Sequence, residues 1–168
     1  RSLAVLGMNE FATDAFLDTL DVPAGLTLAV MVDAKALLGC GLAPAAAVDA
    51  LFPPRDSSRV EWVRIAAHLG EIERCRPLAA RLRELGYRVG LNMMQAAGKP
   101  AGRITALARE VASWDAVAVL YFADSFGSMD GAEVARVVDA LAAGWTGAIG
   151  IHTHNNKSLA VQNTLAAI

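Results

Sequence analysis

Short apolar stretches alternate with amphipathic stretches along most of this chain. Buried strands are predicted over residues 27–33, 60–68, 87–95, 116–124 and 148–154. Helices are predicted over residues 44–51, 72–85, 103–112 and 130–142, and a last one begins near residue 158. Two signals mark helix ends: Gly86 follows the second helix, and Asp130 with Glu133 forms a capping box at the fourth.

The last four strands end every 27 to 30 residues, which is the length of one βα unit. Serial βα units form a parallel sheet with right-handed crossovers. Two architectures compete. One is an open five-stranded doubly wound parallel sheet, which the strand count alone favours. The other is a TIM (β/α)8 barrel, of which the chain would hold about five βα units. In both cases we treat residues 1–168 as a single domain.

Composition excludes several classes of function. The chain is 55% hydrophobic, yet no apolar run approaches the roughly 18 residues that a membrane helix needs. The net charge of −2, without a basic block, argues against a nucleic-acid partner. Cys40 and Cys75 form no disulfide framework, which favours a cytoplasmic location.

The candidate chemistry begins with His152 and His154 at the end of the last strand. Side chains alternate along a strand, so both imidazoles lie on one face, about 7 Å apart. Two imidazoles placed in this way can bind one cation. The alternative is a polar strand end whose histidines bond to water or backbone.

Other polar residues follow the neighbouring strands. Asp124 either orients a ligand or a histidine, or caps the turn before the next helix. Ser125 can donate to a substrate carboxylate. Asn92 and Gln95, inside and at the exit of the third strand, either bind a ligand or satisfy a neighbour. Arg64 is expected to pair with an interior carboxylate, because a buried guanidinium keeps its charge.

Several of these segments together resemble the DRE-TIM metallolyase (HMGL-like) superfamily. The segment from Gly150 to Asn156, followed by Leu159-Ala160 and Asn163-Thr164, is similar to its metal-binding segment. Residues 63–68, 91–95 and 121–129 match its 4-hydroxy-2-oxovalerate aldolase-like branch in order and spacing. The resemblance covers residues 60–168 well and the first sixty loosely.

The resemblance implies a (β/α)8 barrel that binds one divalent cation, Mn²⁺, Mg²⁺ or Zn²⁺. It implies an aldolase or lyase that makes or breaks a carbon–carbon bond of a pyruvate-type 2-oxo acid, with an aldehyde as partner, through a metal-stabilised enolate. By position, His152 and His154 become the metal ligands, and Asp124 and Ser125 lie beside the oxo acid, with Asn92 and Gln95 as further substrate contacts.

The sequence departs from the family pattern at both ends. The Arg-Asp-Gly motif, which supplies the third metal ligand and an arginine, has no counterpart, and Arg1-Ser2-Leu3 resembles the exit of the second barrel strand. We therefore expect a barrel that is incomplete at both ends, whose open strand edges favour association into homo-oligomers. Two alternatives stay open: an acyl-CoA-dependent Claisen-type condensing enzyme, and a non-catalytic degenerate barrel that serves as a binding module.

Overall fold

The structure is a computed structural model, and it describes residues 13–168. Its strands form one sheet in which each strand pairs in parallel with the next along the chain. The strands are β1 (Leu28–Asp33), β2 (Val60–His68), β3 (Arg88–Met94), β4 (Val119–Asp124) and β5 (Ala148–Thr153). All five predicted strands are confirmed, with small differences at their ends. The similarity noted for Arg1-Ser2-Leu3 lies outside the described residues.

Helices connect the strands. They are α2 (Thr13–Leu17), α3 (Ala34–Gly39), α4 (Pro44–Asp49), α5 (Arg76–Glu84), α6 (Ala101–Ala112), α7 (Gly131–Ala142) and α8 (Ala160–Ala166), with the 3-10 turns η1 (Arg55–Ser57) and η2 (Ile72–Cys75). The sequence analysis missed α2 and α3, which are too short to display a helical period. The helix predicted over residues 72–85 is confirmed as α5, but it begins later. Pro77, which lacks an N–H, lies in the first turn of α5, and the preceding residues form a 3-10 turn. None of the described helices is long and apolar enough to cross a membrane.

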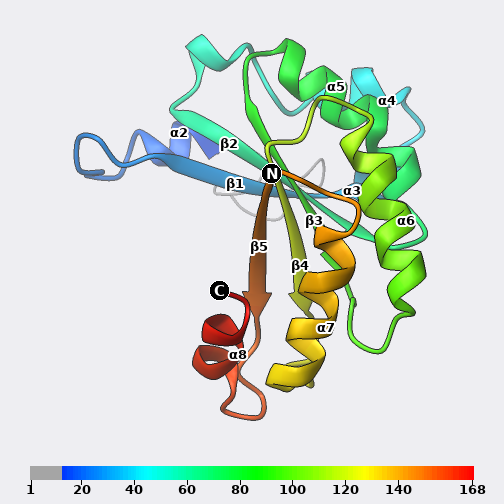
Figure 1. Ribbon diagram of the computed structural model, residues 1–168. Coiled ribbons are helices and arrows are strands. Elements are labelled where there is room, and N and C mark those ends of the chain that lie inside the picture. The colour runs from blue at the N-terminus through cyan, green and yellow to red at the C-terminus, as the bar shows by residue number, and fades with distance from the viewer. Residues whose placement is uncertain (1–12) are drawn as a thin grey trace.

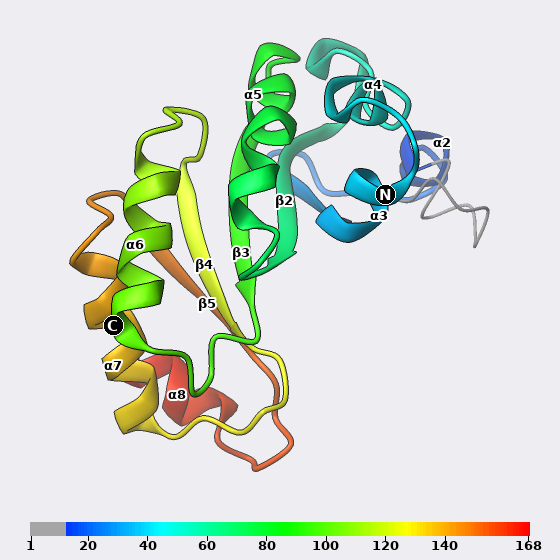
Figure 2. The same ribbon diagram turned by 90° about the vertical axis from the view of Figure 1, so that its right-hand side faces the viewer.

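The strand order decides between the two predicted architectures. A doubly wound sheet reverses its strand order at one point and carries helices on both faces. Here the order is β1-β2-β3-β4-β5 without reversal. Figures 1 and 2 show α5, α6 and α7 along the same side of the sheet. The chain therefore supplies five consecutive βα units of a (β/α)8 barrel, and the doubly wound alternative is wrong.

The two faces of the sheet differ in chemistry. The face toward the helices is apolar and closed to solvent: Val63, Ile65, Leu91, Leu120 and Phe122 are each 0% exposed. Burial of each such side chain stabilises the fold by roughly 1.5–3 kcal/mol. The opposite face is the inner face of the barrel, and it carries the polar residues of the strands. Alternation along each strand thus separates the hydrophobic core from the candidate site.

The start of α7 is connected to the loop after β3. One half of the predicted capping box is present: the side chain of Asp130 accepts a hydrogen bond of 2.9 Å from the N–H of Glu133. Glu133 in turn accepts from the N–H of Gly98 at 2.7 Å and pairs with Arg136. The contacts hold the Gly98 loop against the start of α7, close to the carboxyl ends of the strands.

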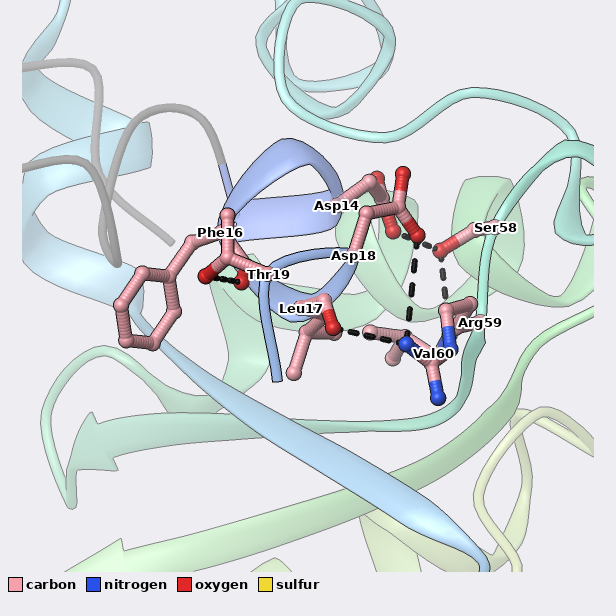
Figure 3. A network of polar contacts seen from close by, with 8 residues as sticks. All are labelled: Asp14, Phe16, Leu17, Asp18, Thr19, Ser58, Arg59 and Val60. Atoms are coloured by element: carbon pink, nitrogen blue, oxygen red, sulfur yellow. Dashed lines mark hydrogen bonds and ion pairs between the residues drawn. The ribbon is translucent and has the colours of Figure 1, made fainter. Parts of the chain in front are cut away.

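A second polar network fixes the start of β2 (Figure 3). The hydroxyl of Ser58 donates to Asp14 of α2 at 2.6 Å and accepts from the N–H of Val60 at 3.1 Å. Arg59 donates to the carbonyl of Leu17 at 2.6 Å. The network attaches α2 to the end of the sheet that is opposite to the candidate site.

Candidate active site

The inner face is hollowed at the carboxyl ends of the strands. A cavity of about 190 Å³ has Asn92, Ser125, His152 and His154 as its polar lining, with Met31 and Met94 among its apolar walls. Two larger hollows, of about 290 and 220 Å³, lie near Val117 and Ala118, before the start of β4. In parallel barrels the active site lies at the carboxyl ends of the strands, so we assign the smaller cavity as the candidate site.

His152 and His154 converge as the alternation predicts. Their Nε2 atoms are 3.1 Å apart, and their ring centroids are 5.1 Å apart. His152 is half-buried and His154 is exposed. Burial, followed by the charges of Arg64 and His154, lowers the pKa of His152 below its ordinary value. A lowered pKa favours the neutral imidazole, which is the form that binds a cation.

The spacing of the two rings fits a shared divalent cation. Two nitrogens that bind one ion at 2.0–2.1 Å in a tetrahedral arrangement lie about 3.4 Å apart, close to the distance between these Nε2 atoms. Within residues 13–168, no group of three His, Cys, Asp or Glu side chains is placed to hold a metal ion. The described part of the chain thus supplies two ligands that fit and no third.

Arg64 of β2 contacts one of these histidines, His152. Its Nη2 lies 3.0 Å from Nδ1 of His152, and its guanidinium stacks on the ring of Tyr121, 4.6 Å from the centroid. The prediction of an interior carboxylate partner is wrong for residues 13–168: the charged group instead meets an imidazole, an aromatic ring and the sulfur of Met31.

Asn92 and Ser125 bring free hydrogen-bonding capacity to the cavity. Asn92 is 3% exposed, and its buried Oδ1 has no partner in the part of the chain that the structure describes. Such an atom is unfavourable unless a ligand or water donates to it. Oγ of Ser125 accepts from the backbone N–H of Gln95 at 2.9 Å, which leaves its own proton available to donate.

Gln95 and Asp124 are placed differently from the other predicted residues. Gln95 has a φ of 57°, and it contributes its backbone N–H to Ser125. Asp124 is 0% exposed, and its two oxygens accept from the N–H groups of Ser128 and Met129 at 2.8 and 3.1 Å. Asp124 thus shapes the turn before α7, and a substrate contact by either residue stays a prediction.

The sequence analysis missed Tyr121, whose aromatic ring stacks against the guanidinium of Arg64. In the register, Asn92 pairs with Tyr121, and Tyr121 pairs with Gly150. A Cβ at Gly150 would overlap with the Tyr121 ring, and one at Gly90 would lie 3.1 Å from it. Glycines inside buried strands often mark such close approaches, and that signal was present in the sequence.

Known proteins are similar to this chain mainly in the part that carries the candidate site. The HMGL-like family model matches residues 59–168. A 4-hydroxy-2-oxovalerate aldolase of Geobacillus thermodenitrificans is 36% identical over 109 residues, which are 65% of this chain and 32% of that protein. 4-Hydroxy-2-oxovalerate aldolase 2 of Salinispora arenicola is 31% identical over 73% of this chain and 35% of its own length. The chain thus spans about a third of the length of these curated relatives.

Solved structures agree on the fold. The N-terminal domain of a candidate aldolase from Bacteroides vulgatus matches 99% of this chain and 53% of its own with a TM-score of 0.75 at 21% identity. The HMG-CoA lyase from Brucella melitensis matches 93% of this chain and 57% of its own with a TM-score of 0.69 at 13% identity. With a family model that covers residues 59–168 and a barrel-type sheet that carries the histidine pair at its carboxyl edge, the chain belongs to the HMGL-like family.

Proposed function

We propose that the protein containing this chain is a divalent-metal-dependent aldolase that makes or breaks a carbon–carbon bond of a pyruvate-type 2-oxo acid. The observation that carries the proposal is the convergence of His152 and His154, with Nε2 atoms 3.1 Å apart, in the cavity that Ser125 and Asn92 also line. Relatives named 4-hydroxy-2-oxovalerate aldolase support the reaction class.

In this proposal each polar residue has a defined task. His152 and His154 hold the cation, which, when bound, supplies a Lewis acid that polarises the ketone and stabilises the developing enolate charge. Ser125, whose Oγ is held by the N–H of Gln95, donates its proton to the substrate carboxylate. Asn92 offers a buried Oδ1 to a donor on the ligand.

The cavity suits a ligand of few atoms. Its volume of about 190 Å³ is below the roughly 300–1,000 Å³ of pockets for drug-sized molecules. Met31 and Met94 give the cavity an apolar wall beside its polar groups. A short 2-oxo acid has the polar groups and the size that this lining can accommodate.

The test is metal-dependent exchange of the methyl protons of pyruvate for deuterium, followed by proton NMR with the purified protein and Mn²⁺. We expect exchange that EDTA abolishes and that His152→Ala and His154→Ala each reduce at least a hundredfold. Thr153→Val is the matched control, because Thr153 lies between the two histidines and alternates to the other face. Exchange that persists in both histidine variants would defeat the proposal, and so would consumption of acetyl-CoA without aldol cleavage.

A further inference from the structure

The contact between Arg64 and His152 fixes the position of a proton. Nη2 of Arg64 lies 3.0 Å from Nδ1 of His152. A guanidinium has only donors, so Nδ1 must accept, and a neutral imidazole then carries its proton on Nε2. That proton points at Nε2 of His154, 3.1 Å away, which must accept in turn. The three side chains therefore form a directed chain of hydrogen bonds from Arg64 to His154.

This chain of hydrogen bonds is incompatible with a cation shared by the two rings. A cation binds the lone pair of a neutral imidazole, and a proton on Nε2 of His152 occupies that position. If the proton of His152 moves from Nε2 to Nδ1, the imidazole stays neutral and the lone pair of Nε2 becomes available to a cation. The new Nδ1–H would then face the N–H groups of Arg64, so the guanidinium has to leave.

The structure provides a place for Arg64 to move. A hollow of about 120 Å³ between β1 and β2 is lined by Ala29, Val30, Met31 and Arg64 itself. Nη2 of Arg64 is already 4.0 Å from the sulfur of Met31, at the edge of this hollow. Movement toward β1 would take the guanidinium away from the ring of Tyr121, because Tyr121 lies on β4, on the other side of β2.

We infer that Arg64 is a positioning residue: its hydrogen bond to Nδ1 of His152 keeps a proton on Nε2 and so blocks the position of a shared cation. Arg64 must release Nδ1 before a divalent cation binds both rings. The inference rests on the proposed metal site, and it adds a competition between the cation and the protein's own guanidinium. Arg64 thereby sets how tightly the site binds its ion.

Titration with Mn²⁺ tests the competition. Arg64→Met removes the charge and the donors but keeps an unbranched side chain, and we expect it to bind Mn²⁺ about tenfold more tightly than the wild type. Arg64→Lys, which keeps the charge, should remain near the wild-type affinity. Arg88→Met is the matched control, because Arg88 stacks on Trp62 at 4.2 Å in the same way but far from the histidines. Equal or weaker binding by Arg64→Met overturns the inference.

A second measurement needs no change at Arg64. Nitrogen-15 NMR of the ion-free wild type distinguishes the two imidazole tautomers, and His68→Gln and His154→Gln assign the signals of the three histidines. We expect the proton of His152 on Nε2, moving to Nδ1 when Zn²⁺ is added, a diamagnetic ion that leaves the signals visible; a proton on Nδ1 before Zn²⁺ is added overturns the inference. Pyruvate exchange in the wild type with unchanged Mn²⁺ affinity in Arg64→Met would reject this inference alone, whereas no Mn²⁺ binding by either protein would reject the metal site as well.

Discussion

The ring of Tyr121 on β4 lies over Gly150 on β5, in the space that a side chain at position 150 would fill. The same ring supports the guanidinium of Arg64, which contacts His152. The absence of a side chain at Gly150 is therefore a condition for the arrangement of the whole inner face.

Gly150→Ala is expected to lower the free energy of unfolding by about 1–3 kcal/mol, because the added methyl group must displace an aromatic ring. Gly102→Ala in α6 is the control: nothing lies within 4 Å of its Cβ position, and alanine is favoured there by about 0.5–1 kcal/mol. Urea unfolding measures both variants. Equal stability of the two would contradict the placement of Tyr121.

Asp124→Ala is expected to destabilise the fold by about 2–5 kcal/mol, since it leaves the N–H groups of Ser128 and Met129 without an acceptor. Asp124→Asn keeps one carbonyl oxygen and should lose less. Urea unfolding of both variants is the measurement. If Asp124→Ala unfolds like the wild type, the carboxylate does not hold this turn.

The two cysteines should differ in reactivity. Burial raises the pKa of the Cys75 thiol to about 12, whereas Cys40 is only half-buried. Because the thiolate is the reactive form, iodoacetamide at pH 8 should modify Cys40 and leave Cys75 intact until the protein unfolds. Peptide mass spectrometry measures both sites. Rapid labelling of Cys75 in the folded protein would show that η2 does not pack as described.

Glu133 should contribute to stability in a pH-dependent way. Its hydrogen bonds with Arg136 lower the pKa of Glu133, with the N–H of Gly98 as a further cause. A lowered folded pKa means that the stabilisation is present above the unfolded value of about 4.3 and is lost as the pH falls through the folded value. The stability difference between wild type and Glu133→Gln should therefore shrink from pH 7 to pH 3. Asp56→Asn, at a fully exposed side chain, is the control, and a difference that stays constant would refute the assignment.

Much of the fold could be predicted because buried strands leave a strong signal. The apolar run at residues 60–68 matches β2 at both ends, and Asp130 caps α7 as predicted. The strand order could not be read in the same way. Pairing of β1 with β2 rather than with a later strand depends on long-range packing. The strand count alone therefore favoured the open sheet, and only the family resemblance favoured the barrel.

The site was predicted unevenly for a similar reason. Alternation within one strand is local, and it brought His152 and His154 to one face as expected. The contact of Arg64 with His152 joins residues on strands that are not neighbours, and no local pattern reports it. The hydrogen bond from the N–H of Ser128 to Asp124 depends on the path of the turn after β4, and no local pattern in the sequence reports that path.

The division of the sheet into an apolar face and a polar inner face has an evolutionary consequence. Side chains such as Ile65 and Leu91 are 0% exposed within the core, whereas the adjacent residues Ala66 and Asn92 line the cavity. Positions that line the cavity can thus vary with less effect on the core than their neighbours, whereas Gly150, which lies against Tyr121, cannot. Proteins with this sheet can therefore acquire new substrates through substitutions at a few residues that line the cavity, while the fold stays the same.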